Sequence, residues 1–377
     1  MKESTGHVDE VNGDDGTAGL NDHLKKNWCA EIAAYKIIVT GGHDEAWLAL
    51  MRMGRPLWWS TITTQDGLTE SRATEVLNLA ANKLMLGVPP DVDTYNEATM
   101  FGVASMLCRL GVRIHPKSML ASRAAADLMA ILAYVNYEKD AYISSYASDP
   151  VLALGAIKVW YELADGLAKY ILPEFKKLLL GGDIDQGDAG GMTACVLLLL
   201  AMDKCAMKGK PFSEIVMKYE FVPVLDFLKV VEGEEIKIFC KGMVRANDEK
   251  IAFITWRSRW KDWYMGFTHF VQLQLERNED TLWYLLGRRA AGIFPRNQNG
   301  ADLLIPIFWR TPRVAVADDS EMKTNSKEGM TEEIVSLMLV KVETRSTNEF
   351  EMAKSVLSQL CSRFVFGEQD NKPRRTH

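Results

Sequence analysis

Three charged residues near the C-terminal end of the chain have the types and spacing of a metal site. Asp302 stands near the start of an apolar run at 301–309, and Lys341 and Glu343 stand two residues apart at the end of a second apolar run at 334–342. Because successive strand residues alternate faces, Lys341 and Glu343 would leave the same face of a strand. Carboxylates on neighbouring strands hold Mg²⁺, which polarises a phosphodiester and lowers the pKa of a bound water, while a lysine stabilises developing charge. The spacing indicates metal-dependent phosphodiesterase chemistry, with Asp302 and Glu343 as metal ligands and Lys341 as the electrostatic stabiliser.

The same spacing is also typical of a strand that ends in solvent. In that interpretation Lys341 and Glu343 lie on an edge strand and point to water, and Asp302 caps the first strand. A charge inside so apolar a segment is costly unless it is paired, which is why these residues carry information. Both interpretations stay open at the level of sequence.

A second segment interleaves aromatic rings with cations. Residues 255–270 read TWRSRWKDWYMGFTHF. Aromatic faces stack on bases and arginines pair with phosphates, so the segment is a candidate nucleic-acid surface. Its candidate contacts are Arg257, Arg259, Trp260 and Lys261. The alternative is that the tryptophans form a buried helical face between two domains, while the cations stay in water.

Further cations follow in residues 287–299. Arg288, Arg289 and Arg296 precede Asp302 in the chain and are candidates for a phosphate track. They are equally placed as cations near the C-terminal end of a helix, which would be a structural role. His269 is the only histidine near these elements; a lone histidine is more often structural, but it can orient a phosphate or a water.

The composition bounds the class of protein. The chain has 377 residues, of which 47% are hydrophobic and 25% are charged, as in a globular protein of two or three domains. A formal charge of -6 and a pI of about 5.7 exclude a global basic field, so any nucleic-acid binding must come from a local patch. The six cysteines form no CxxC pair and no zinc spacing, which favours reduced thiols.

Targeting signals and common catalytic motifs are absent from the sequence. The first residues are polar and acidic, unlike a signal peptide, and no apolar run reaches membrane-spanning length. We therefore expect an intracellular protein, cytoplasmic or nuclear, with no membrane partner. Glycine-rich nucleotide loops, a GxSxG elbow and an HExxH helix are missing. The acidic segment 181–191 lacks two ligands of a calcium loop and is interpreted as an interhelical loop.

The pattern along the chain changes near residue 232. Residues 1–22 are acidic and glycine-rich and are expected to be disordered. Residues 23–231 show helical periodicity, and residues 232–366 alternate strand-like and helical segments before a basic tail at 367–377. We predict an α+β protein, in which an all-α helical N-terminal domain precedes a small α/β C-terminal domain.

Individual elements are predicted from periodicity and capping signals. Thr94 followed by Glu97 fits a capping box, and Asp149 before Pro150 fits an N-cap with proline in the first turn. The predicted helices are 69–86, 95–110, 117–135, 150–163, 192–207, 213–231, 280–294 and 348–364. The predicted strands are 236–244 and 250–255, which form a hairpin, and 301–309 and 334–342, which are buried.

The segment GRRAAGIFPRNQNGADLLIPIF, followed by LMLVKVETR, resembles the C-terminal module of a family of large fungal proteins. These are related to crinkler-type proteins, which join an NTPase to a restriction-endonuclease-like domain. Three further segments are similar to the same family: MRMGRPLWWS at 51–60, YASDPVLALGA at 146–156 and GFTHFVQLQ at 266–274.

The resemblance implies a nuclease core of the PD-(D/E)XK type. There, an aspartate before an apolar strand and a Glu/Gln-x-Lys on the next strand bind metal and activate water, and a further strand follows the last helix. Asp302 falls on the aspartate position, whereas Lys341 falls on the acidic position and Glu343 on the lysine, so these two charges are exchanged. The family often adds a glutamate from a preceding helix, for which Glu276 and Glu279 are candidates. Its NTPase motifs are missing, which suggests a fragment or a degenerate member.

Two classes of function follow from these observations. The first is a Mg²⁺-dependent nuclease-like protein that acts on or binds nucleic acid, with Arg257, Arg259 and Arg296 on the phosphate backbone. Metal sites tolerate only small errors in ligand placement, so the exchanged pair indicates a degenerate active site. The second is a non-catalytic interaction protein, such as an effector or pseudoenzyme, that docks a protein partner through the helical domain. A third interpretation is a subunit of a larger NTPase assembly.

Overall fold

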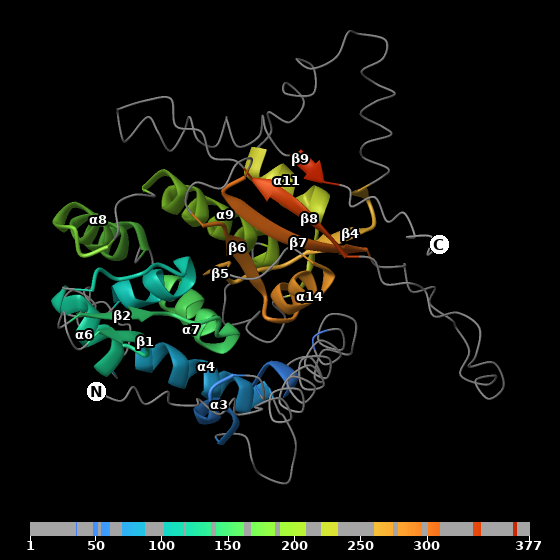
Figure 1. Cartoon of the computed structure of the whole chain (residues 1–377). Coiled ribbons are helices and arrows are strands. Elements are labelled where there is room, and N and C mark those ends of the chain that lie inside the picture. The colour runs from blue at the N-terminus through green and yellow to red at the C-terminus, as the bar shows by residue number, and fades with distance from the viewer. Residues whose placement is uncertain are drawn as a thin grey trace, which may run out of the picture.

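The structure is a computed structural model of the chain (Figure 1). It describes residues 35, 48–51, 54–60, 70–86, 102–116, 118–136, 141–161, 167–184, 189–208, 220–232, 260–273, 278–295, 301–309, 335–340 and 365–367. The predicted tail at 1–22, the predicted hairpin at 236–255 and the predicted helix at 348–364 lie outside the described residues.

Helices and strands are mixed along the chain, which makes it an α+β protein. The helices are α3 (Pro56–Ser60), α4 (Glu70–Leu84), α6 (Met119–Ala126), α7 (Pro150–Tyr161), the π-helix η1 (Leu167–Ile171), α8 (Leu172–Gly181), α9 (Ala189–Met207), α11 (Val224–Glu232) and α14 (Glu279–Gly287), and residues 102–110 are also helical. The strands are β1 (Ile131–Asn136), β2 (Ala141–Ser145), β3 (Val222–Pro223), β4 (Trp263–Met265), β5 (His269–Gln272), β6 (Ala290–Ile293), β7 (Leu303–Trp309), β8 (Val335–Val340) and β9 (Val365–Gly367).

The part before residue 232 is not purely helical, which corrects the prediction of an all-α domain. β1 and β2 pair antiparallel as a hairpin, and β3 pairs antiparallel with β4 in the main sheet. The predicted helix at 117–135 therefore ends early, at Ala126. The sequence ILAYVN of β1 contains β-branched and aromatic residues, which suit a strand better than a helix.

The predicted helix at 280–294 is also shorter than expected. α14 ends at Gly287, and Arg289 then adopts a left-handed backbone with a φ of 53°. A left-handed residue cannot continue a right-handed helix, so the chain leaves α14 there. The next four residues form β6, which pairs in parallel with β5.

The main sheet has seven strands and is mostly antiparallel. Its order is β3-β4-β7-β6-β5, and β8 pairs with β7 while β9 pairs with β8. Only β5 and β6 run parallel among the described pairs, and α14 is the connection between them. β9, near the C-terminal end, pairs antiparallel with β8.

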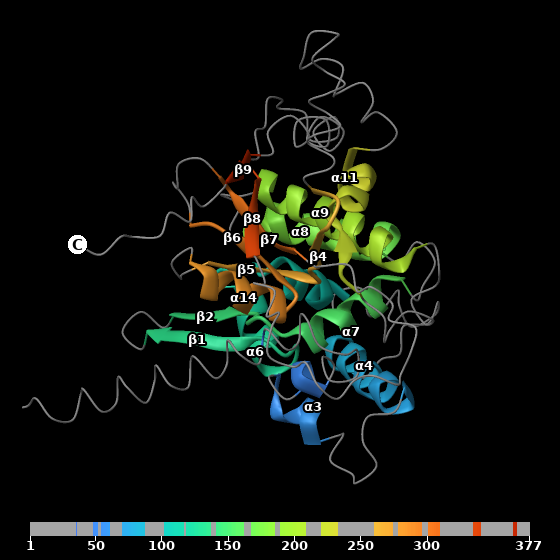
Figure 2. The ribbon, with the colours of Figure 1, turned by 90° about the vertical axis from the view of Figure 1, so that its right-hand side faces the viewer.

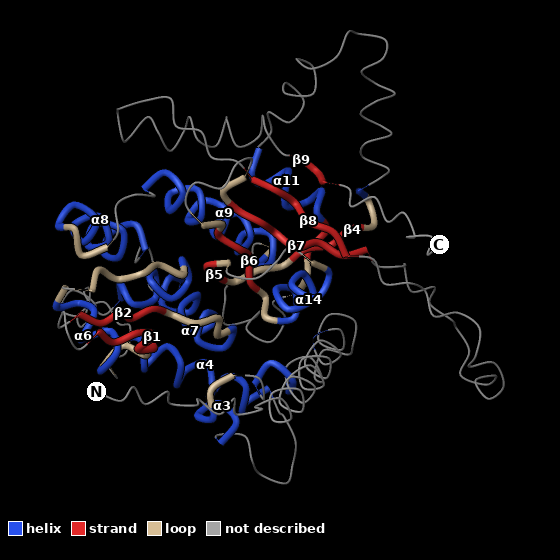
Figure 3. The backbone as a smooth tube through the Cα atoms, viewed as in Figure 1, coloured by secondary structure: helices blue, strands red, loops and turns tan. Residues whose placement is uncertain are grey.

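Both faces of the central strand β7 are covered by helices. Leu303, Ile305 and Ile307 belong to the large hydrophobic cluster formed with the helices of the N-terminal part. Leu304 belongs to a separate cluster with Leu282 and other side chains of α14. This alternation explains the nearly continuous apolar sequence and confirms the prediction that β7 is buried. Figure 3 shows the sheet with α9 and α11 on one side and α14 on the other.

The packing does not divide at residue 232. The largest cluster of buried hydrophobic residues runs from Met51 to Met338 and includes side chains of both parts. Gly111, at the end of helix 102–110, has a φ of 59°, and a Cβ there would lie 2.3 Å from the carbonyl oxygen of Phe270 in β5. Glycine is required at this contact for both its backbone conformation and its lack of a side chain.

Several predicted helices are confirmed. α4 buries Val76, Leu77, Ala80 and Leu84, the residues that the helical spacing places on one face. α7 begins at Pro150, and the Asp149 carboxylate accepts a hydrogen bond of 3.0 Å from the Leu152 N–H, as predicted for an N-cap. In the described part of the chain, no helix has the length and apolar character needed to cross a membrane.

Candidate functional site

Asp302 lies in a bend immediately before β7 and is half-buried. Its carbonyl oxygen accepts a 2.9 Å hydrogen bond from the Phe294 N–H, which ties the start of β7 to the end of β6. β8 ends at Val340, which lies opposite Leu303 on β7. Leu303 follows Asp302 in the sequence, and Val340 precedes Lys341. Leu303 and Val340 are therefore direct neighbours on adjacent antiparallel strands.

Several predicted site residues lie outside the described residues. They are Lys341, Glu343, Arg257, Arg259, Arg296 and Glu276. Within the described ranges, no group of three His, Cys, Asp or Glu side chains could hold a metal ion. The Asp302 carboxylate is an oxygen donor of the kind that Mg²⁺ prefers. Of the two predicted metal ligands, Asp302 lies within the described residues and Glu343 lies outside them.

Glu279 belongs to the same end of the sheet as Asp302. α14 connects the end of β5 to the start of β6, so its N-terminus points toward the end where β7 begins. Asn278 caps the helix by accepting a 2.9 Å hydrogen bond from the Thr281 N–H. The Glu279 carboxylate accepts a 3.0 Å hydrogen bond from Nε1 of the buried Trp283, which orients that carboxylate.

Arg288 lies at the opposite end of the sheet. It precedes β6, whereas Asp302 is tied to Phe294, which follows β6. Four strand residues span about 10 Å, so Arg288 is not brought beside Asp302. Its guanidinium lies 5.5 Å from the ring centre of Tyr284, and the Arg289 guanidinium lies 3.4 Å from the ring centre of Phe221.

Trp260 and Lys261 differ in their exposure. Trp260 is only 7% exposed, and its ring centre lies 5.5 Å from that of Trp263. The expectation that Trp260 offers a face for base stacking is not met, because the ring is packed in the core. Lys261 is exposed, with its ammonium 3.8 Å from the Asp262 carboxylate. The interpretation that the tryptophans are buried while a cation stays in water fits these two residues.

A fully buried ion pair joins the helices to the sheet. Arg109 in helix 102–110 donates two hydrogen bonds, of 2.7 and 2.8 Å, to the carboxylate of Asp203 in α9. Its Nε donates to the carbonyl oxygen of Thr268 at 2.8 Å, and its guanidinium lies over the Trp160 ring at 4.1 Å. The Tyr161 hydroxyl donates to Asp203 at 2.9 Å. Burial of charge is tolerated here because the two ions are paired and further hydrogen-bonded.

His269 is connected to the Arg109–Asp203 pair through its neighbour Thr268, which contacts both Arg109 and the His269 ring. The Thr268 hydroxyl donates to the carbonyl oxygen of Arg289 at 3.2 Å and contacts His269 Nδ1 at 3.0 Å. A hydroxyl has one proton, so Nδ1–H must be the donor toward Thr268. Nε2 is then the acceptor, and the Ser148 hydroxyl, 2.9 Å away, donates to it.

The Ser148–His269 pair has the geometry of a hydrolase dyad but not its electrostatics. Burial, and then the positive charges of Arg288 and Arg109, together lower the pKa of His269 from 6.5 to about 3. A general base works best when its pKa lies near the working pH. His269 is therefore a neutral acceptor that holds Ser148 in place, and it is poorly suited to taking the serine proton.

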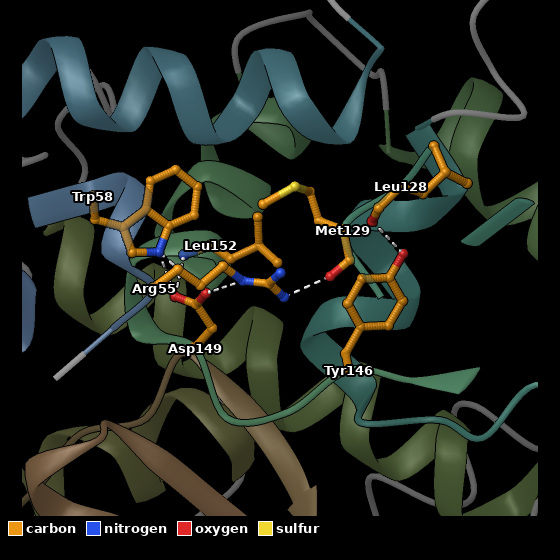
Figure 4. A network of polar contacts seen from close by, with 7 residues as sticks. All are labelled: Arg55, Trp58, Leu128, Met129, Tyr146, Asp149 and Leu152. Atoms are coloured by element: carbon orange, nitrogen blue, oxygen red, sulfur yellow. Dashed lines mark hydrogen bonds and ion pairs between the residues drawn. The ribbon is translucent and has the colours of Figure 1, made fainter. Parts of the chain in front are cut away.

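A third set of polar contacts surrounds Asp149, as Figure 4 shows. Its carboxylate accepts hydrogen bonds from Arg55 Nε at 2.8 Å and from Trp58 Nε1 at 3.1 Å, in addition to the helix cap. Arg55 also donates to the carbonyl oxygen of Met129 at 2.5 Å. The Tyr146 hydroxyl donates to the carbonyl oxygen of Leu128 at 2.8 Å.

Three short segments, 51–60, 146–156 and 266–274, meet through these contacts. Arg55 and Trp58 of segment 51–60 bind Asp149 of segment 146–156. Ser148 of that segment contacts His269 of segment 266–274.

The buried ion pair of Arg109 and Asp203 was not predicted from the sequence. The available signal was a charge inside an apolar run, for Arg109 in FGVASMLCRLG and for Asp203 in VLLLLAMDKCAM.

The fold and these contacts define an α+β protein whose mixed sheet lies between two helical layers. The chain belongs to the family described as Domain of unknown function (DUF8736), whose model matches residues 95–318. Comparison with curated proteins and with solved structures gives no match. The matched range contains Asp302 and the Arg109 and His269 contacts, and it ends before β8, so Lys341 and Glu343 lie outside it.

Proposed function

We propose that the chain is a nuclease-like protein that acts on or binds nucleic acid at the end of the main sheet where β7 begins and β8 ends. The observation that supports this most directly is the register of β7 and β8, in which Leu303 lies opposite Val340. The two halves of the motif, Asp302 and the Lys341–Glu343 pair, adjoin these two positions in sequence.

In this proposal the carboxylates of Asp302 and Glu343 hold the metal ion. Mg²⁺, when bound, polarises a phosphodiester and lowers the pKa of a water. Lys341 stabilises negative charge on the phosphate, and Arg257, Arg259 and Arg296 bind the backbone. Arg288 and Trp260 are left out of the site, because one lies at the far end of β6 and the other is buried.

The exchanged positions of Lys341 and Glu343 bear on catalysis more than on binding. Binding of a phosphate backbone needs positive charge of roughly correct placement, whereas catalysis loses about a hundredfold for an error of about 1 Å. We therefore infer that binding of nucleic acid is the more robust activity and that cleavage is weak.

The test uses labelled single- and double-stranded DNA and RNA, in Mg²⁺ and then in Mn²⁺. Asp302→Asn removes a charge while keeping the shape, and Glu75→Gln on the exposed face of α4 is the matched control. The proposal predicts that wild type and Glu75→Gln bind or cleave at least one substrate and that Asp302→Asn loses the part of that activity that depends on the divalent ion. A folded wild-type chain that neither binds nor cleaves any of them contradicts it.

A second candidate function, a non-catalytic interaction protein, is supported by exposed apolar side chains on the helical part. Met119 at the start of α6 is 82% exposed, and Leu180 near the end of α8 is 65% exposed. Their elements are tied together by a 2.5 Å hydrogen bond from the Ser118 hydroxyl to Asp183. A contiguous exposed apolar patch is typical of docking sites for other proteins. A folded chain that responds to no nucleic acid and no divalent ion favours this function.

A further inference from the structure

We propose that Arg55 is a latch that holds the base of the β1–β2 hairpin, and that the hairpin moves as a unit when the latch opens. The latch consists of Arg55 with its two partners, the Met129 carbonyl oxygen and the Asp149 carboxylate (Figure 4). This inference does not depend on the proposed function.

The contacts lie where the chain enters and leaves the hairpin. Leu128 and Met129 come just before β1, and Tyr146 and Asp149 come just after β2. The Tyr146 hydroxyl joins the exit to the entry through the carbonyl oxygen of Leu128. Arg55, just before α3, binds the entry at Met129, which is 74 residues away in the sequence, and the exit at Asp149, which is 94 residues away.

Met129 is held in an unfavourable backbone conformation. Its φ is 65°, in the left-handed region, which is unfavourable for a residue with a side chain. Such a conformation persists only where the surroundings impose it. Here its carbonyl oxygen is bound by Arg55, and the flanking Ala130 N–H donates to the carbonyl oxygen of Ala124 at 2.9 Å. The turn before β1 therefore stores strain that the latch restrains.

Apart from the latch, the hairpin is held by α6 and by the backbone of residues 113–114, which bridges to Ser144 and Ser145 of β2. β1 and β2 form a two-stranded sheet separate from the main sheet, and they pack chiefly against α6. Figure 2 shows the hairpin extending away from the helices toward one side of the molecule. A two-stranded hairpin is at best marginally stable by itself. Ile131 and Leu132 at its base are 42% and 50% exposed, so these two apolar side chains are incompletely buried.

Arg55 is the member of this group best suited to open and close. Its side chain is 25% exposed, whereas that of Asp149 is 5% exposed and also caps α7 and binds Trp58. Losing Asp149 would disturb a helix and a buried tryptophan, whereas on losing the Arg55 contacts the Asp149 carboxylate keeps its hydrogen bonds from Trp58 Nε1 and the Leu152 N–H. The latch therefore acts on one segment without unfolding the core.

The test is amide hydrogen exchange on the full chain, compared between the hairpin and the main sheet. Arg55→Met removes both latch contacts, and Arg113→Met removes an exposed arginine beside the same hairpin, whose backbone bridges to Ser145. The proposal predicts that exchange in β1 and β2 accelerates about tenfold in Arg55→Met, as expected for loss of a charge-assisted hydrogen bond, and does not change in β7. Arg113→Met should exchange like wild type.

Met129→Gly is the second variant, because glycine adopts a left-handed φ without the side-chain penalty. Added to Arg55→Met it should recover part of the lost protection, and alone it should leave the hairpin folded. Three outcomes overturn the proposal. In the first, Arg55→Met accelerates amide exchange equally in β7 and in the hairpin. In the second, Arg55→Met leaves exchange in the hairpin unchanged. In the third, Arg113→Met accelerates exchange in the hairpin as much as Arg55→Met does.

Discussion

His269 is held at both nitrogens of its ring, by Ser148 at Nε2 and by Thr268 at Nδ1. The sequence singled it out as the lone histidine near the candidate elements and left a structural role and a phosphate-orienting role open. Its surroundings favour the structural role, because its 1% exposure excludes contact with a large substrate. The role of His269 is therefore set by Ser148, which is 121 residues away in the chain, and by Thr268, the preceding residue.

The low pKa of His269 predicts how stability depends on pH. The pKa falls from 6.5 to about 3, first because of burial and then because of Arg288 and Arg109. Below pH 6.5 the unfolded chain binds a proton at this group and the folded chain does not, so stability declines as the pH falls, until the pH nears 3. Above pH 6.5 both states are neutral at this group, and its contribution is constant.

Unfolding by urea between pH 7.5 and pH 4.5 measures this effect. His269→Gln, which keeps a hydrogen-bonding side chain and does not titrate, should show a weaker loss of stability at low pH than wild type. Equal slopes for the two proteins would mean that His269 is not buried in its neutral form.

Helix 102–110 and α9 are joined through Arg109 and Asp203, and this pair gives a prediction at the scale of elements. Asp203→Leu leaves the Arg109 charge buried without its carboxylate, which costs about 3–5 kcal/mol. The double variant Arg109→Met with Asp203→Leu removes both charges and should recover most of that loss. Denaturant unfolding of the single and double variants checks this. A double variant that is no more stable than Asp203→Leu would contradict it.

Elements with strong local patterns could be predicted from the sequence. α4 and α7 have helical periodicity or a capping signal, and β7 and β8 are apolar runs of strand length. The strand β6, of sequence AAGI, was predicted as helix because alanine favours helices. These residues form a strand because they pair with β5, from which α14 separates them in the sequence. Pairing between segments that are not adjacent in the sequence leaves no pattern within either segment.

The candidate site could be predicted only in part, for the same reason. The position of Asp302 before a buried strand is a local property and was found. The pairing of Arg109 with Asp203 spans 94 residues, so the sequence marks each charge as unusual without naming its partner. Likewise, nothing in the sequence of segment 51–60 indicates that Arg55 binds the carbonyl oxygen of Met129.

At the scale of the whole molecule, the two ends of the main sheet differ in chemistry. One end holds Asp302 and the α14 N-terminus with Glu279. The other end holds His269, Arg288 and Arg289, in contact with buried groups of the helical part. The second end joins the two parts of the chain, and the first is the end that we propose for nucleic acid.

The measurement that tests this proposal most directly is the melting temperature in Mg²⁺ and in Mn²⁺. A ligand that binds the folded state raises its stability by mass action. We predict that wild type and Glu75→Gln gain stability as the ion concentration rises and that Asp302→Asn gains none. The same gain in Asp302→Asn, or no gain in wild type, would contradict a metal site at Asp302.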